Sequence, residues 1–120
     1  MVKRILIVED DMILSMVNKH YVESLGHQVI QSVRNGLDAI HAAKKHDPDI
    51  IIMDIRIEGH MNGIEAMEEI RTFSNADVIY LTGNSEPTTR LRAEKTNMLD
   101  FCIKPITFED LKIAIEKSKK

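Results

Sequence analysis

The chain has 120 residues, of which 43% are hydrophobic and 29% charged, and we interpret residues 1–120 as a single globular domain. No apolar run is long enough to span a membrane, and the N-terminal sequence reaches acidic residues before a signal-peptide core develops, so we expect no membrane association. One cysteine excludes an internal disulfide framework and fits a cytoplasmic protein, while a net charge of −3 argues against direct nucleic-acid binding.

Five short apolar runs predict five β-strands. They occupy residues 5–8, 29–33, 50–53, 78–81 and 101–103. These runs are rich in β-branched residues and mostly lack polar alternation, which is typical of strands buried on both faces. We therefore expect a sheet that is covered on both sides.

Segments with helical spacing separate the strands, and each of the first three has an apolar face. The expected faces are Ile13, Val17, Tyr21 and Leu25; Leu37, Ile40 and Ala43; and Ile64, Met67 and Ile70. Asp10 or Asp11 is expected to cap the first helix, and the sequence Asp47–Pro48 is expected to end the second.

The last two helices differ in the strength of their pattern. In the fourth, Pro87 suits a first helical turn, but only Leu91 and Met98 mark an apolar face. In the fifth, Thr107 and Asp110 resemble a capping box. The apolar residues that follow this box are Leu111, Ala114 and Ile115.

Strict alternation of strands and helices predicts an α/β fold with a parallel sheet and helices on both faces. Right-handed crossovers place the C-terminal ends of all the strands at one edge of the sheet. Ligand sites in such sheets form at that edge, near the point where the strand order switches. The residues at the strand ends are therefore the candidates for function.

Carboxylates, a hydroxyl and a lysine follow the predicted strands. The first strand leads into Glu9, Asp10 and Asp11; the others lead into Asp54, Thr82 and Lys104. Each residue alone is most often a turn former or a helix cap. Together they suit a divalent cation with oxygen ligands, such as Mg²⁺, and a phosphoryl group held by electrostatic interactions. An aspartate can itself be the nucleophile and form an acyl phosphate.

The whole chain resembles the receiver domain of two-component response regulators. The motifs that carry the resemblance are "KRILIVEDD", "IIIMDIR", "NGIEAMEEIR", "VIYLTG" and "DFCIKPI", in this order and spacing. The family fold is a flavodoxin-like, doubly wound sheet of five parallel strands in the order 2-1-3-4-5, flanked by five helices. The resemblance implies this fold for the present chain.

The resemblance also assigns roles to the residues at the sheet edge. Asp54 matches the phosphorylated aspartate, and Lys104 matches the lysine that pairs with the phosphoryl oxygens. Asp10, Asp54 and the backbone carbonyl of Arg56 match the Mg²⁺ ligands, and Glu9 matches a residue that acts through water. The bond from Lys104 to Pro105 is expected to be cis, which is uncommon even before proline.

Two further residues match the family's conformational switch. Thr82 matches the hydroxyl that moves toward a new phosphoryl oxygen, and Phe101 matches the aromatic whose rotamer follows it. The implied result is a shift between two populated states. The alternative for Phe101 is a plain core aromatic.

The sequence departs from the usual family pattern in three places. The loop after Asp54 has Glu58 where the family often has proline, and it is one residue longer than the commonest form. Asn97 and Met98 replace the usual small residues before the fifth strand. Arg56 and Asn84 lie where the family tunes the access of water to the acyl phosphate.

The function implied is a phosphoaccepting signalling module, not an enzyme beyond its own phosphorylation and dephosphorylation. Its partners would be a histidine kinase or phosphotransfer protein and a downstream target, or an effector domain absent from this chain. One alternative is a receiver-like interaction module that does not cycle. Another is a phosphotransferase of the haloacid-dehalogenase kind, which would need a second acid where this chain has Arg56.

We expect the remaining polar and sulfur residues to be structural. His60 is interpreted as a solvated loop residue, because no second metal ligand has a suitable spacing. Cys102 is expected to be an inert buried thiol. The seven methionines are expected to fill the core, with any exposed ones near Phe101 serving a partner surface.

Overall fold

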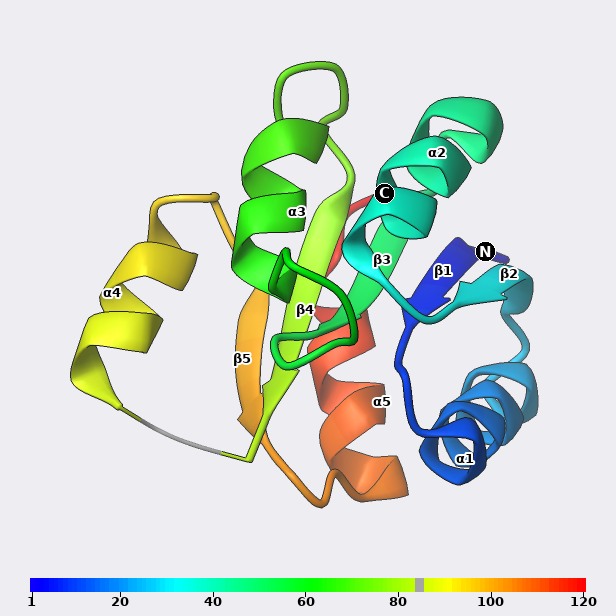
Figure 1. Ribbon diagram of the computed structural model, residues 1–120. Helices are drawn as coiled ribbons and strands as arrows, with labels where there is room; N and C mark the ends of the chain where they lie inside the picture. Colours follow the sequence, from blue (N-terminus) through cyan, green and yellow to red (C-terminus); the bar gives the residue numbers. More distant parts are fainter. Residues whose placement is uncertain (84–85) are drawn as a thin grey trace.

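The computed structural model describes residues 1–83 and 86–120, in which five strands alternate with five helices (Figure 1). The strands are β1 (Arg4–Val8), β2 (Gln28–Val33), β3 (Ile50–Asp54), β4 (Asp77–Thr82) and β5 (Asp100–Ile103). The helices are α1 (Met12–Ser24), α2 (Gly36–His46), α3 (Gly63–Ile70), α4 (Pro87–Glu94) and α5 (Phe108–Glu116).

The strands form one parallel sheet in the order β2-β1-β3-β4-β5, which confirms the expected topology. The chain runs outward from β1 to β2, returns to β3 and continues to β5 on the other side. The ends of β1 and β3 are therefore neighbours at the switch point, with Val8 paired to Met53. This pairing brings the acidic residues after β1 to Asp54 at the end of β3.

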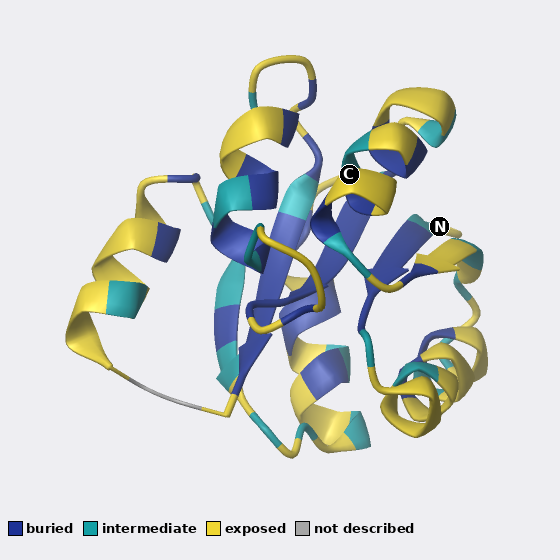
Figure 2. Cartoon of the chain, viewed as in Figure 1, coloured by how far each residue is buried: buried dark blue, intermediate teal, exposed yellow. Residues whose placement is uncertain are grey.

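Alternate residues of the central strands form two separate cores. Figure 2 shows these strands coloured as buried. On one face, residues such as Ile51 and Met53 pack against α2 and α3. On the other face, residues such as Ile50 and Ile52 pack against α1 and α5. The central strands are thus buried on both sides, as expected, and hold the edge residues on a rigid platform.

The two outer strands differ from the expectation of burial on both faces. Gln31 and Ser32 of β2 are exposed, and so is Ile103 of β5. Cys102 of β5 is half-buried rather than fully buried. Edge strands have a neighbour on one side only, and helices at the rim cover them incompletely.

The predicted faces of α1 and α2 are confirmed in their later residues, since Tyr21, Leu25, Ile40 and Ala43 pack in or against the core, but not in their first residues. Ile13 is 72% exposed, and α1 instead buries Asn18 and Val22 against the sheet. Leu37 and Leu91 are also exposed, each 60%. The residues that α2 and α4 bury are small, which lets the helix backbone approach the sheet closely; they are Gly36, Ala39, Ala42, Ala43 and Ala93. The prediction for α3 is confirmed, since Ile64, Met67 and Ile70 are all buried.

Side-chain caps fix where most of the helices begin. Asp11 accepts hydrogen bonds from the backbone N–H groups of Ile13 and Leu14, so it is the cap of α1. Thr107 caps α5 as expected by accepting from the N–H of Asp110, which is one half of the predicted capping box. A reciprocal capping box begins α3, where Asn62 and Glu65 each accept from the other's backbone N–H. These caps satisfy donors that helix ends leave unpaired.

Helix α4 is held mainly by polar contacts, because Ala93 is its one buried residue. The hydroxyls of Tyr80 and Thr96 lie 2.7 Å apart in the interior, which joins β4 to the turn after α4. Arg71 donates to the carbonyls of Thr96 and Ala76, joining the end of α3 to the same region.

No helix of the described residues has the length and apolar character needed to cross a membrane.

Candidate functional site

Three carboxylates converge at the C-terminal edge of the sheet. Oxygen atoms of Glu9, Asp10 and Asp54 all lie within 4.8 Å of one another. Glu9 and Asp54 are almost fully buried, with exposed fractions of 2% and 3%, while Asp10 lies nearer to solvent. The topology thus brings together residues that are 44 positions apart in the sequence, as the strand-end argument predicted.

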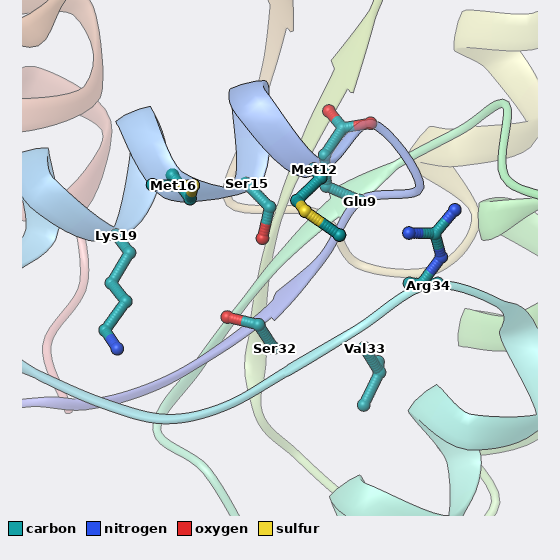
Figure 3. A pocket seen from close by; sticks show the side chains of 8 residues that line it. All are labelled: Glu9, Met12, Ser15, Met16, Lys19, Ser32, Val33 and Arg34. Carbon is teal, nitrogen blue, oxygen red and sulfur yellow. The ribbon is translucent and has the colours of Figure 1, made fainter.

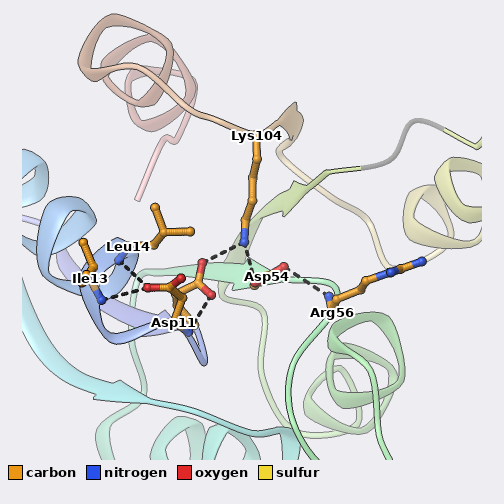
Figure 4. Close-up of polar contacts among 7 residues, drawn as sticks. Asp11, Ile13, Leu14, Asp54, Arg56 and Lys104 are labelled. Atoms are coloured by element: carbon orange, nitrogen blue, oxygen red, sulfur yellow. Dashed lines mark hydrogen bonds and ion pairs between the residues drawn. The ribbon is translucent and has the colours of Figure 1, made fainter.

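Lys104 neutralises part of this negative charge (Figure 4). Its Nζ lies 2.6 Å from Asp54 Oδ2 and 2.9 Å from Glu9 Oε1. The expected cis bond between Lys104 and Pro105 is confirmed. One ammonium group therefore bridges the two buried carboxylates.

The crowding of carboxylates perturbs their protonation. Burial raises the pKa of Glu9, and hydrogen bonding to Asp54 raises it further, although Lys104 acts in the opposite direction. Burial and the neighbouring Glu9 likewise raise the pKa of Asp10. Burial lowers the pKa of Lys104, but its hydrogen bonds to Asp54 and Glu9 outweigh this effect and the net change is upward. Burial and neighbouring carboxylates disfavour the charged form of an acid, whereas the same carboxylates favour the charged form of a lysine.

The acid cluster fits a hard divalent cation. Carboxylate oxygens are the ligands such ions prefer, and burial together with the neighbouring carboxylates raises the pKa values of Glu9 and Asp10, an effect that a bound cation would oppose. Asp11 is separate from this cluster, because its side chain caps α1. Its backbone N–H donates to Glu9 Oε2 and so helps to hold Glu9 in place.

The backbone around Asp54 is closely packed. The N–H of Arg56 donates to Asp54 Oδ1 at 3.2 Å, which fixes the second carboxylate oxygen. Figure 4 shows the Arg56 side chain pointing away from the carboxylates. Gly63 lies against the carbonyl of Asp54, where a Cβ atom would clash with that oxygen and with Met53. The start of α3 therefore packs directly against the backbone of Asp54.

Thr82 and Phe101 lie on the neighbouring strands. Thr82 is buried at the end of β4, and its carbonyl accepts a hydrogen bond from the N–H of Lys104. Phe101 is also buried, with its ring 6.5 Å from the ring of Tyr80. The guanidinium of Arg90 lies 5.3 Å from the Phe101 ring, in cation–π contact. Sequence reasoning missed Tyr80 and Arg90, since no local motif links them to the aromatic.

The described departures from the usual family pattern lie in two places, the loop after β3 and the turn before β5. Glu58 is exposed and pairs with Arg34. Asn97 has a φ of +58°, a conformation that asparagine tolerates better than most residues, and Met98 packs against the core. Asn84 lies outside the described residues.

The histidines, the cysteine and the methionines complete the comparison with expectation. His60 is exposed in its loop, and no described histidine joins a metal-capable cluster. Burial raises the pKa of Cys102 to about 11, which fits an unreactive thiol. Met53, Met61, Met67 and Met98 lie in or against the core as expected, whereas Met1, Met12 and Met16 are exposed.

The family model for the response regulator receiver domain matches residues 5–116 of this chain. This chain belongs to that family. The receiver domain is a signalling module of two-component systems and not a conventional enzyme. The observed strand order, the acidic cluster and the lysine all agree with membership.

Curated and solved receivers are similar over nearly the whole chain. The chemotaxis protein CheY of Thermotoga maritima is 33% identical, over 98% of both chains. A signal receiver domain of a modulated diguanylate cyclase from Desulfovibrio desulfuricans superposes with a TM-score of 0.90 at 29% identity, covering 98% of this chain and 94% of that one.

Other relatives are longer. The probable C4-dicarboxylate response regulator DctR of Priestia megaterium is 31% identical over 94% of this chain, which spans 50% of its length. Several of the curated relatives are thus about twice as long as the region that this chain matches.

Proposed function

We propose that this receiver accepts a phosphoryl group on Asp54 in a two-component phosphorelay. The observation that carries the proposal is the buried Asp54 carboxylate, held by Lys104 and faced by Glu9 and Asp10. A carboxylate so placed is a nucleophile with a fixed orientation, next to a cation that can accompany the incoming phosphoryl oxygens.

Mg²⁺ is the proposed cofactor. Asp10, Asp54 and the backbone carbonyl of Arg56 would hold it, with Glu9 acting through water. When bound, the ion supplies positive charge that stabilises the charge on the transferred phosphoryl oxygens. Glu9 and Lys104 keep the Asp54 carboxylate oriented, and burial of the site limits access of water to the acyl phosphate.

The phosphodonor would be a histidine kinase or phosphotransfer protein. An oxygen of Asp54 attacks the phosphorus of a phosphohistidine; a new O–P bond forms, the N–P bond breaks, and the leaving imidazole nitrogen keeps the electron pair and takes up a proton. The acyl phosphate later loses the group to water.

The donor would contact the N-terminal half of α1. Met12, Ile13 and Met16 are exposed there, immediately after the acidic loop. A hollow of about 210 Å³ opens next to Lys104, between α1 and the loop after β5. Its apolar lining residues are Leu14, Val17, Leu81, Pro105 and Ile106. Apolar surface this close to the phosphoacceptor suits a partner that must bring its histidine to Asp54.

Phosphorylation would then change the surface around Phe101. Thr82 would move to donate a hydrogen bond to the new phosphoryl oxygen. The Phe101 side chain would then turn inward into the space that Thr82 leaves. Such a change shifts the balance of two states through a new local charge. The receiver would transmit it to a downstream protein or to an effector domain in a longer chain.

The test is phosphorylation with a small phosphodonor. Protein in Mg²⁺ is incubated with acetyl phosphate and its intact mass is measured. We expect one phosphoryl adduct on the wild type and on Asp11→Asn, whose side chain only caps α1, and none on Asp54→Asn. A wild type that binds Mg²⁺ but shows no adduct would contradict the proposal.

Two further measurements separate the alternatives. Sustained hydrolysis of a generic phosphate ester, abolished by Asp54→Asn, would favour the haloacid-dehalogenase reading. Affinity for a partner that does not change on phosphorylation would favour an interaction module that does not cycle.

A further inference from the structure

The loop that follows Asp54 is tied to the loop between β2 and α2. Residues 55–62 form the first loop, and residues 34–35 form the second. Asn35 and Glu58 make an isolated parallel bridge between the two backbones. Glu58 Oε1 also accepts a hydrogen bond from Arg34 Nε at 3.2 Å. A backbone contact and an ion pair therefore join the same two segments.

A packing contact lies beside this pair. A Cβ atom on Gly36 would lie 2.9 Å from Met61 Sδ, closer than side-chain atoms normally approach. The first residue of α2 therefore lies directly against the β3–α3 loop. The open hollow between the two segments measures about 570 Å³.

The tie is adjacent to the acidic cluster. Figure 3 shows Arg34 lining the same hollow as Glu9. The N–H of Glu9 donates to the carbonyl of Val33, so Arg34 follows directly after a residue bonded to the acidic loop. The hydrogen bond to Glu58 raises the pKa of Arg34, and the charges of Asp10 and Asp11 act in the same direction. Arg34 thus lies within the field of the acidic loop.

We propose that Arg34, Asn35 and Glu58 form a latch that positions the metal-binding loop. Arg56, whose carbonyl is a proposed metal ligand, precedes Glu58 by two residues. Holding Glu58 restricts the backbone of Arg56 before the metal arrives, which lowers the entropy that binding must remove. Arg34 and Glu58 are positioning residues and touch neither metal nor phosphoryl group. The inference rests on the proposed Mg²⁺ site.

The test compares Mg²⁺ affinity by calorimetry with amide hydrogen exchange of residues 55–62 in metal-free protein. Arg34→Ala and Glu58→Ala should each raise the Kd for Mg²⁺ about three- to tenfold. This effect is smaller than is usual for residues that hold metal ligands in place, because the Arg34–Glu58 pair is half-exposed. Both should also speed exchange in the loop. The charge-swapped double variant, Arg34→Glu with Glu58→Arg, should restore both properties.

The Arg92–Glu68 ion pair is a matched control, since it has similar exposure and joins α4 to α3. Removing it should leave the Mg²⁺ affinity unchanged. If Arg34→Ala strengthens Mg²⁺ binding while Glu58→Ala weakens it, the pair acts by charge alone and the latch is overturned. Failure of the swapped variant to recover overturns it too. A wild type that does not bind Mg²⁺ contradicts the proposed function instead, while metal-free exchange still tests the latch.

Discussion

Lys104→Met should destabilise the metal-free protein by an amount that grows with pH. Lys104 is the cation that bridges Glu9 and Asp54, and both carboxylates are almost fully buried. Without the ammonium group, the folded protein must either keep two buried charges together or bind a proton. Breaking a buried ion pair by removing one partner commonly costs about 3–5 kcal/mol.

Proton binding limits the part of this cost that comes from the unpaired charge of Glu9. Glu9 starts from an ordinary pKa of 4.5, which we take for the unfolded chain. At pH 7.0, which is 2.5 units above this pKa, protonating Glu9 costs about 3.4 kcal/mol at 1.36 kcal/mol per unit. At pH 5.5 the same limit is about 1.4 kcal/mol. Since Lys104 is 21% exposed and partly screened, we expect a loss of about 2 kcal/mol at pH 7.0.

The sign follows from proton linkage. In the variant, the folded-state pKa of Glu9 is raised still further above its unfolded value, so the folded state binds more protons between the two values. Stability is then retained near pH 4.5 and lost as pH rises toward neutrality.

The measurement is urea unfolding in a metal chelator between pH 5.5 and 7.5, with wild type and Lys45→Met as references. Lys45 is exposed on α2, so its variant should show no pH-dependent loss. Adding Mg²⁺ should recover part of the Lys104→Met deficit. A deficit that is independent of pH would refute the reasoning and point to lost packing.

Three further changes follow from the same structure. Tyr80→Phe removes a buried hydrogen bond and should cost about 1 kcal/mol. Because burial raises the pKa of Tyr80 to about 12, the free energy of unfolding of the wild type should also fall between pH 10 and 12. The variant, measured by urea unfolding over the same pH range, should not show this fall. Gly63→Ala should lower the free energy of unfolding by roughly 3 kcal/mol or more and abolish phosphorylation, because its Cβ would clash with the backbone carbonyl of Asp54. Gly83→Ala is the control and should unfold like the wild type in urea, because its Cβ would meet no neighbouring atom. Mg²⁺ affinity measured by calorimetry should fall on acidification at pH values above the ordinary carboxylate range, since the raised pKa values of Glu9 and Asp10 favour the protonated forms that cannot bind metal.

The positions of the strands and the types of side chain at their ends could be predicted from the sequence without the structure. Runs such as residues 50–53 are apolar throughout because both faces of a central parallel strand are buried. Parallel pairing and right-handed crossovers then bring the strand ends to one edge whatever the helices do. This is why Glu9, Asp54 and Lys104 could be grouped from residues far apart in the chain.

The burial of the first residues of α1 and α2 could not be predicted in the same way. Ile13 and Leu37 continue an apolar spacing, yet both face solvent. Helix α2 instead turns its alanines to the sheet. Small residues let a helix approach closely, and dense packing of the whole face outweighs the burial of one large side chain. A periodic pattern records how many apolar residues lie on a face, but it does not record the distance at which that face packs.

The amino-acid sequence by itself determined the parallel sheet, the acidic edge and the lysine beside it, because each depends on local patterns and on general rules of chain topology. Only the tertiary structure decided which side chains from distant loops meet there. The pairing of Arg34 with Glu58 and the approach of Arg90 to Phe101 depend on loop paths and helix positions. Those contacts carry no signature in sequence spacing, since long side chains on exposed segments have many partners within reach until the packed core selects one arrangement.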